Sequence, residues 1–127
     1  MTKRILLVDD EPYIVLTVST RLKGNGYEVI TAEDGQAGLD MARKEKPDLI
    51  ILDLMLPKID GFKVCGLLKR DIRYSKIPVV IFTAKAQEED QRLGQEMGAD
   101  AYLIKPFKAE VLLETIQKLL DERACSD

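Results

Sequence analysis

The sequence predicts an α/β fold built on a doubly wound, five-stranded parallel sheet. Five short apolar runs alternate with longer amphipathic segments along the 127 residues, in units of roughly 20–25 residues. The run at Asp48–Asp53, with the sequence DLIILD, shows no polar alternation, as expected for a strand that helices cover on both faces. Five such units are too few to close an eight-stranded barrel, so an open sheet with right-handed crossovers is favoured.

Each apolar run is expected to form one strand, because it is rich in β-branched or aliphatic residues and is bounded by Pro, Gly or Asp. The expected strands are, in order, Ile5–Val8, Tyr27–Thr31, Leu49–Leu54, Val79–Phe82 and Ala101–Ile104. The segments between and after them are expected to be helices.

Local signals indicate where the helices begin and end. Pro12 suits the first turn of a helix, where its missing N–H is not needed, and Asp60 is a candidate N-cap. Asn25-Gly26 is typical of a helix stop. The final helix is predicted over Lys108–Glu122, and its apolar stripe comprises Leu112, Ile116, Leu119 and Leu120.

Length, composition and charge restrict the possible functions. The chain has the size of one domain, which we assign to residues 1–122, with 123–127 as a tail or the start of a linker. It contains no histidine, which excludes histidine-based metal sites and catalysis, and its two cysteines lack metal-ligand spacing. The formal charge of −3 argues against direct binding of nucleic acid or an acidic membrane, and no apolar run approaches the length of a membrane span. We therefore expect a cytoplasmic location.

Polar side chains suited to chemistry follow four of the five expected strands. Asp9-Asp10-Glu11 follow the first strand, the third strand ends in Asp53, Thr83 follows the fourth and Lys105 follows the fifth. In the flavodoxin-like strand order 2-1-3-4-5, strands one and three are neighbours, and ligands bind beyond the carboxyl ends of the strands. The acids would then share a pocket with Thr83 and Lys105 at its rim. Each residue alone has an ordinary explanation, such as a helix cap or a solvated charge, but the combination does not.

Crowded carboxylates need a counter-ion. Two unit charges about 4 Å apart repel by about 4 kcal/mol at an effective dielectric of ~20. Lys105 supplies one positive charge, which is not enough, and ligation by oxygen alone suits Mg²⁺, with Mn²⁺ as a substitute. A pocket with acids, a metal, a lysine and a hydroxyl predicts phosphoryl chemistry at a carboxylate. Glu11 is expected only as a charge favoured at a helix start.

Four motifs in this order resemble those of the two-component response-regulator receiver domain, with a chemotaxis-regulator-like character. They are VDDEP (8–12), LIILDLMLPKIDG (49–61), VVIFTAKA (79–86) and GADAYLIKPF (98–107), and the resemblance extends from Lys3 to about Leu120. It implies a signalling domain rather than an enzyme, one that assists only its own phosphorylation and autodephosphorylation. It also implies a sensor histidine kinase, or a phosphotransfer protein, as the phosphodonor.

The resemblance assigns roles to the acidic residues. Asp53 would be the phosphoacceptor. Asp10 and Asp53 would ligate Mg²⁺ together with the backbone carbonyl of Met55, and Asp9 would act through a bound water. Met55 and Lys85 would border the path of the hydrolytic water, and we expect them to tune the lifetime of the phosphoryl group.

The resemblance also assigns roles to the other strand ends. Lys105 would pair with the phosphoryl group, and Thr83 would donate a hydrogen bond to it. Tyr102 matches the switch aromatic that turns inward when the threonine moves, and the Lys105–Pro106 bond matches one that is cis in the family. Phosphorylation would change the surface of the fourth helix, the fifth strand and the fifth helix, and so control a downstream protein or an output domain absent from this chain.

Two features depart from the receivers of winged-helix transcription factors. The chain has Asp100-Ala101-Tyr102 where they carry Asp-Asp before the aromatic, and its final helix has no arginine before Arg123. We therefore expect a monomer or a weak phosphorylation-dependent dimer rather than their charged dimer face. The chain is either a stand-alone receiver or part of a longer regulator, and the sequence does not decide between them.

Three alternatives fit the residues less well. A phosphatase or phosphomutase of the haloacid-dehalogenase type would carry its nucleophile in a DxD pattern after the first strand, where this chain has DDEP. An FMN carrier would place hydroxyl and N–H donors there, whereas these carboxylates would repel a phosphate. A degenerate receiver used only as an interaction module would have lost groups that this chain retains, namely Asp10, Asp53, Thr83 and Lys105.

Overall fold

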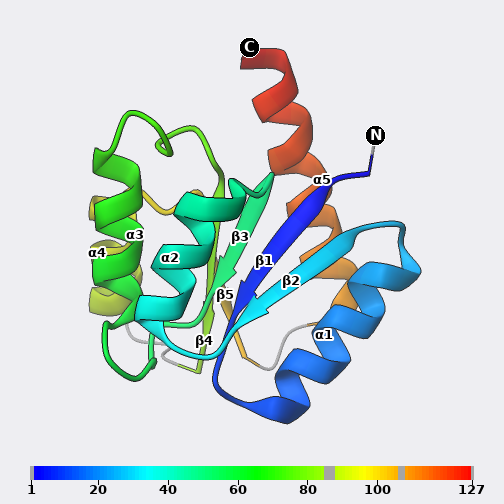
Figure 1. Ribbon diagram of the computed structural model, residues 1–127, viewed down its shortest axis with the longest axis horizontal. Coiled ribbons are helices and arrows are strands. Elements are labelled where there is room, and N and C mark those ends of the chain that lie inside the picture. Colours follow the sequence, from blue (N-terminus) through cyan, green and yellow to red (C-terminus); the bar gives the residue numbers. More distant parts are fainter. Residues whose placement is uncertain (1, 85–87, 106–107, 127) are drawn as a thin grey trace.

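The computed structural model describes residues 2–84, 88–105 and 108–126, and in the last helix the side chains up to residue 123. Its strands are β1 (Arg4–Val8), β2 (Glu28–Ala32), β3 (Leu49–Leu52), β4 (Val79–Thr83) and β5 (Ala101–Ile104). Its helices are α1 (Pro12–Gly24), α2 (Gly35–Glu45), α3 (Gly61–Arg70), α4 (Glu88–Glu96) and α5 (Ala109–Ser126). Strands and helices alternate along the chain, as the sequence predicted (Figure 1).

The strands form one parallel sheet in the order β2-β1-β3-β4-β5, which confirms the predicted doubly wound fold. The chain adds β2 on one side of β1 and then β3, β4 and β5 on the other side, so the strand order reverses between β1 and β3. The carboxyl ends of all the strands meet at one edge of the sheet, the lower edge in Figure 1. A ligand site in a sheet of this kind lies at that edge, beside the reversal point.

Alternate side chains of the sheet supply two separate hydrophobic cores. Leu6 and Val8 of β1 pack with α2 and α3 on one face, whereas Ile5 and Leu7 pack with α1 and α5 on the other face. All four side chains are fully buried. Because helices cover both faces, neither side of the central strands tolerates a polar residue, which explains the uninterrupted apolar run in β3.

The third strand ends earlier than the predicted boundary at Leu54. The N–H of Asp53 donates to the carbonyl of Val8 at 3.0 Å, and this bond is the last one between β1 and the segment that follows β3. The carbonyl of Leu54 then accepts from Leu56 and from Gly61, each at 3.1 Å, and these bonds turn the chain away from the sheet. Asp53 therefore lies just beyond the strand.

Other boundaries also differ from the prediction: β1 begins one residue earlier, β2 and β4 each end one residue later, and α5 begins one residue later. β2 begins one residue later, because the N–H of Tyr27 donates to the carbonyl of Leu22 (3.1 Å) in the turn that ends α1. The final helix continues past Glu122, so the start of the predicted tail is helical. The guanidinium of Arg123 donates to the carbonyl of Asp48 at 2.8 Å and ties this extension to the loop before β3.

The local signals predicted for the ends of α1 and the start of α3 are confirmed. Pro12 is the first residue of α1, and Gly26, with φ of +89°, follows its C-cap. The side chain of Asp60 caps α3 by accepting from the N–H of Lys63 at 3.0 Å. None of the helices in the described part of the chain is both long and apolar enough to cross a bilayer.

Gly61, the first residue of α3, packs directly on the backbone that carries Asp53. A Cβ at this position would lie 2.2 Å from the carbonyl oxygen of Asp53 and 2.7 Å from the Cα of Leu54. Because neither backbone atom can move without moving the strand end, only glycine fits here. The contact holds the residue after β3 in a fixed place.

Candidate functional site

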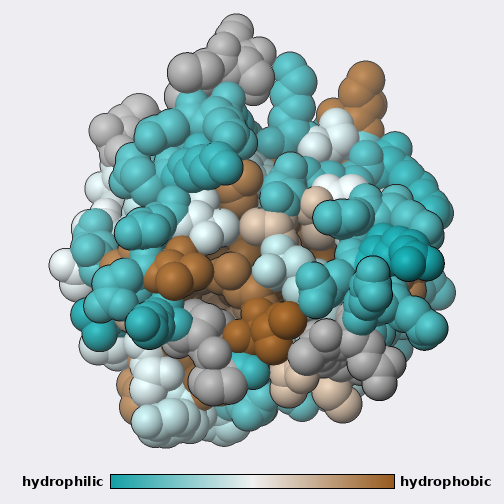
Figure 2. Space-filling model, turned by 180° about the vertical axis from the view of Figure 1, so that it is seen from behind, coloured by the Kyte–Doolittle hydropathy of each residue, from teal (hydrophilic) through white to brown (hydrophobic). Residues whose placement is uncertain are grey.

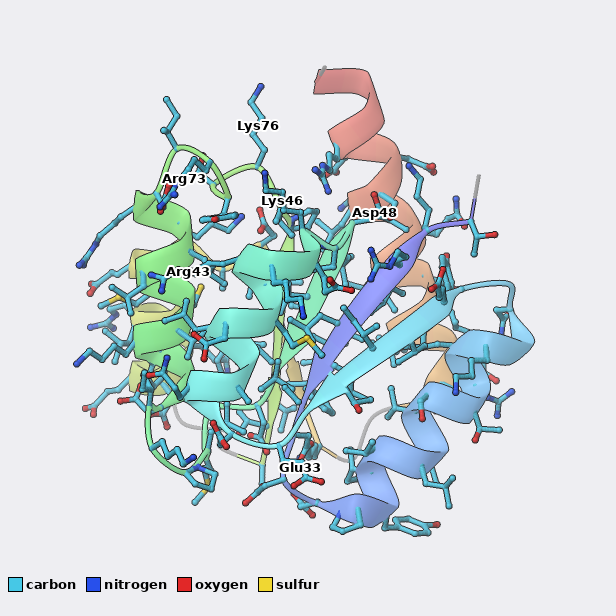
Figure 3. The ribbon with its side chains drawn as sticks, in the orientation of Figure 1. Glu33, Arg43, Lys46, Asp48, Arg73 and Lys76 are labelled. Carbon is cyan, nitrogen blue, oxygen red and sulfur yellow. The ribbon has the colours of Figure 1, made fainter. Side chains whose placement is uncertain are left out.

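The residues predicted from the strand ends meet at the carboxyl edge of the sheet. Asp9 directly follows β1, Asp53 directly follows β3, and Thr83 is the last residue of β4. Lys105 directly follows β5, and its N–H donates to the carbonyl of Thr83 at 2.8 Å, which extends the β4–β5 pairing. Figure 3 marks the same edge with Glu33, the residue after β2.

Asp9, Asp10 and Asp53 form the acidic cluster that the sequence predicted. One carboxylate oxygen of each lies within 4.8 Å of the others. Asp9 and Asp53 are only 0% and 3% exposed, whereas Asp10 is exposed to solvent. Hard oxygen ligands gathered in one place, with one side open to water, fit a divalent cation such as Mg²⁺, which binds through few carboxylates and keeps several waters. The residues therefore match the predicted metal.

Lys105 provides a positive charge inside this cluster. Its Nζ lies 3.1 Å from Oδ2 of Asp9, 3.2 Å from Oδ2 of Asp53 and 3.0 Å from Oε1 of Glu11. The same ammonium lies 4.7 Å from the centroid of the Phe82 ring, a distance that allows a cation–π interaction. The lysine side chain is 13% exposed, so these ion pairs are screened far less than pairs on the surface.

Burial and charge act against each other in the pKa values of this pocket. Burial raises the pKa of Asp9, although hydrogen bonds from the N–H of Glu11 (2.9 Å) and from Lys105 partly offset that effect. Burial alone would lower the pKa of Lys105, but the hydrogen bond to Glu11 and the charges of Asp53 and Asp9 outweigh it, so the pKa of Lys105 is raised. The lysine is therefore a permanent cation at neutral pH.

Glu11 is the site residue that sequence reasoning missed. The sequence predicted only a charge at the start of a helix, and Glu11 is indeed the N-cap residue of α1. Its carboxylate, however, makes no cap hydrogen bond within the described residues, and it pairs instead with Lys105. A third acid after Asp9 and Asp10 was the available signal, but no spacing rule says which cation such a side chain reaches.

The loop after β3 holds the carboxylate of Asp53. The N–H of Met55 donates to Oδ1 of Asp53 at 3.2 Å, which leaves Oδ2 for Lys105. The side chain of Met55, two residues after Asp53, is 60% exposed. The metal-ligand role of its carbonyl stays a prediction.

The two predicted switch residues lie on neighbouring strands. Thr83 is fully buried at the end of β4. Tyr102 of β5 is half-buried, pairs in register with Ile81 and packs beside Gly94 of α4, where an added Cβ would lie 3.1 Å from the ring. Burial raises the pKa of Tyr102, and the charges of Asp90 and Asp53 add to the effect. The predicted roles of Lys85 and Pro106 fall on positions outside the described residues.

The sequence of this chain is similar to one family of domains and to known proteins that contain it. The sequence matches the family model of the response regulator receiver domain over residues 5–117. It is 46% identical over 122 residues to the alkaline phosphatase synthesis transcriptional regulatory protein PhoP of Bacillus subtilis, covering 94% of this chain and 49% of that protein. It is 42% identical over 117 residues to protein PilH of Pseudomonas aeruginosa, covering 92% of this chain and 97% of that protein.

Solved structures agree with the sequence comparison. A CheY-like response regulator receiver domain protein from Methanospirillum hungatei superposes with a TM-score of 0.94 at 31% identity, over 100% of both chains. Chemotaxis response regulator CheY4 of Vibrio cholerae superposes with a TM-score of 0.87 at 35% identity, over 94% of this chain and 99% of that one. The chain spans about half the length of PhoP and nearly all of PilH. From the family match, these relatives and the site geometry, the chain belongs to the response regulator receiver domain family of two-component systems.

Proposed function

We propose that Asp53 is the phosphoacceptor of a signalling switch and that it is phosphorylated by a sensor histidine kinase or a phosphotransfer protein. The observation that carries this proposal is the position of Asp53. It is a buried carboxylate 3.2 Å from the ammonium of Lys105, within a cluster of acids that fits Mg²⁺. A carboxylate needs both neighbours to receive a dianionic group, because the added charge must be neutralised.

The chemistry is an in-line phosphoryl transfer. A carboxylate oxygen of Asp53 attacks phosphorus, the P–N bond of the donor phosphohistidine breaks, and the imidazole nitrogen keeps the electron pair. Asp10, Asp53 and the carbonyl of Met55 would hold Mg²⁺ or Mn²⁺, with Asp9 acting through a water. When bound, the metal supplies charge neutralisation for the transferred group. Lys105 would pair with a phosphoryl oxygen.

The readout of the switch is proposed to be the surface formed by α4, β5 and α5. Thr83 would move toward the phosphoryl group, and Tyr102, which lies between the core and α4, would take up the space that this movement opens. Seen from behind the sheet, hydrophobic residues gather around a central hollow bordered by hydrophilic ones (Figure 2). Val111 of α5 is 42% exposed and gives this face an apolar contact point for a downstream protein. We propose that the protein works in the cytoplasm as a monomer or a weak phosphorylation-dependent dimer.

Incubation with Mg²⁺ and acetyl phosphate tests the proposed acceptor. We expect the intact mass to increase by one phosphoryl group, and we expect hydroxylamine, which cleaves acyl phosphates, to remove it. Peptide mapping after borohydride reduction should place the modification on Asp53. No gain in mass with Mg²⁺ present, or a gain that maps to another residue, would refute the proposal.

Met55 is proposed to control how long the phosphoryl group lasts. Its backbone N–H binds the carboxylate of Asp53 and its side chain is exposed, so that side chain can reach the acyl phosphate and shield it from water. Met55→Ala is expected to shorten the half-life of the phosphorylated protein in a hydrolysis time course. Ile72→Ala is a matched control, because Ile72 is also an exposed apolar residue but lies in the loop between α3 and β4. Equal half-lives for both variants and wild type would contradict this role.

A further inference from the structure

Glu11 makes a contact with the reactive lysine that the proposed function does not use. Its Oε1 lies 3.0 Å from Nζ of Lys105, and its side chain is 57% exposed. Its own N–H donates to Oδ1 of Asp9 at 2.9 Å, which fixes the backbone of Glu11 against the acidic cluster. The carboxylate is therefore presented to the lysine from the N-cap position of α1.

The ammonium of Lys105 has a limited number of donors. A lysine carries three N–H groups and no acceptor. Oxygens of Asp9, Glu11 and Asp53 lie 3.1, 3.0 and 3.2 Å from its nitrogen, so the three donors have three carboxylate partners. Each phosphoryl oxygen that binds this ammonium must therefore replace one of the three carboxylates.

Burial decides which carboxylate gives way. Phosphorylation turns the charged carboxylate of Asp53 into an uncharged acyl group, so the donor that it held passes to the phosphoryl group. Of the two carboxylates that stay charged, Asp9 is almost completely buried, and it would leave an unpaired charge in the interior if it lost the lysine. Glu11 is more than half exposed, so water can replace the ammonium at little cost. Glu11 is therefore the charged partner that a second phosphoryl oxygen replaces most readily.

We propose that Glu11 is a positioning residue that occupies one donor of Lys105 in the resting protein and yields it to a second phosphoryl oxygen of the group on Asp53. This inference rests on the proposed function of Asp53 as the acceptor. Glu11 then competes with the phosphoryl group for the lysine. The competition holds the ammonium at the mouth of the pocket before phosphorylation and weakens the phosphorylated state by a modest factor.

Beryllofluoride, a mimic of the phosphoryl group, measures this competition. At saturating Mg²⁺, Glu11→Gln is expected to bind beryllofluoride about two- to fivefold more tightly than wild type, the range for loss of an exposed ion pair. Glu33→Gln is the matched control, because Glu33 follows β2 at the same edge of the sheet and the substitution removes the same charge (Figure 3). Within the described part of the structure, no ion pair joins Glu33 to Lys105.

A second variant separates the contact from the charge. Glu11→Asp keeps the negative charge but shortens the side chain, and an aspartate at an N-cap turns toward the helix N–H groups. It should bind beryllofluoride as tightly as Glu11→Gln if the contact matters. If Glu11→Asp bound beryllofluoride only as tightly as wild type does, the negative charge and not the contact with Lys105 would explain the effect of Glu11→Gln. That result would overturn the proposal.

The resting contact has its own readout, which involves no phosphoryl group. In metal-free protein, the ¹⁵N signal of the Lys105 ammonium, assigned with Lys105→Arg, is expected to shift in Glu11→Gln and not in Glu33→Gln. An unchanged signal, or a Glu11→Gln affinity for beryllofluoride equal to or below that of Glu33→Gln, would overturn the role of Glu11. Failure of wild type itself to bind beryllofluoride would instead refute the acceptor role of Asp53.

Discussion

The Asp53→Asn variant is expected to gain no phosphoryl group from acetyl phosphate and Mg²⁺, under conditions in which wild type gains one. An amide oxygen is not a nucleophile of useful strength, so the loss should be complete rather than partial. Asparagine has the same shape, and its Oδ1 can still accept the hydrogen bond that Met55 donates to Asp53. The expected defect is therefore one of chemistry and not of folding. Intact-mass measurement over time gives the result directly.

Stability separates this explanation from a folding defect. Asp53 is a buried charge close to Asp9 and Asp10, and Lys105 keeps its contacts with Asp9 and Glu11 when Asp53 is neutral. Removing one of several crowded like charges should leave the free energy of unfolding unchanged or raise it by about 1 kcal/mol in metal-free buffer, as is common at functional sites.

Asp40→Asn is the control for Asp53→Asn, because Asp40 is an exposed aspartate on α2 that accepts a hydrogen bond from Gln36. Asp40→Asn should be phosphorylated like wild type. If Asp53→Asn gained as much phosphate as this control, the assignment of Asp53 as the acceptor would be contradicted. If Asp53→Asn were inactive because it is markedly less stable, the explanation by chemistry would be contradicted.

The fold was predictable because burial on both faces leaves a clear pattern in the sequence. Each central strand is an uninterrupted apolar run, and the run at Ala101–Ile104 has the bounds that the structure shows. The errors lie at the ends, where single backbone hydrogen bonds decide. The N–H of Tyr27 donates to the turn after α1, so Tyr27 is not part of β2. The N–H of Asp53 makes the last hydrogen bond to β1 from the segment that follows β3. Neither bond has a signature in local composition.

The site was predictable in part for a topological reason. Asp9, Asp53 and Lys105 each follow a strand and Thr83 ends one, and the carboxyl ends of parallel strands lie at one edge of the sheet. Glu11 escaped prediction because its contact joins positions 94 residues apart through two flexible side chains. Topology places the backbone of such residues, but the rotamers and the competing partners decide which charges meet.

Lys105→Met is expected to be the most destabilising single change at the site. The methionine keeps most of the apolar stem, so the variant removes the charge with little loss of packing. Asp9 and Asp53 then remain buried without their cation. Breaking a buried ion pair by removing one partner costs about 3 kcal/mol or more, and we expect a loss of that size in urea unfolding with EDTA present. Mg²⁺ should restore much of it, since a ligand at about 100 times its Kd adds about 2.7 kcal/mol.

The pH dependence of Lys105→Met follows from Asp9. Burial raises the pKa of Asp9 in the folded protein, and Lys105 opposes that rise, so the substitution should raise this pKa further. A raised carboxyl pKa means that the folded state binds the proton more tightly than the unfolded state, so stability falls as pH rises through the interval between the two pKa values. The deficit of Lys105→Met relative to wild type should therefore be largest at neutral pH and shrink as the pH is lowered, when a proton replaces the missing cation.

Lys58→Met is the matched control for Lys105→Met, because Lys58 is exposed and pairs with Asp34 at 3.6 Å on the surface. A surface pair of this kind contributes about 0–1 kcal/mol, so Lys58→Met should unfold almost like wild type and respond to Mg²⁺ as wild type does. The two variants lose the same charge, and the expected difference between them comes from burial. Equal stabilities for Lys105→Met and Lys58→Met in EDTA would mean that the buried carboxylates do not depend on Lys105. The proposed charge balance of the pocket would then be wrong.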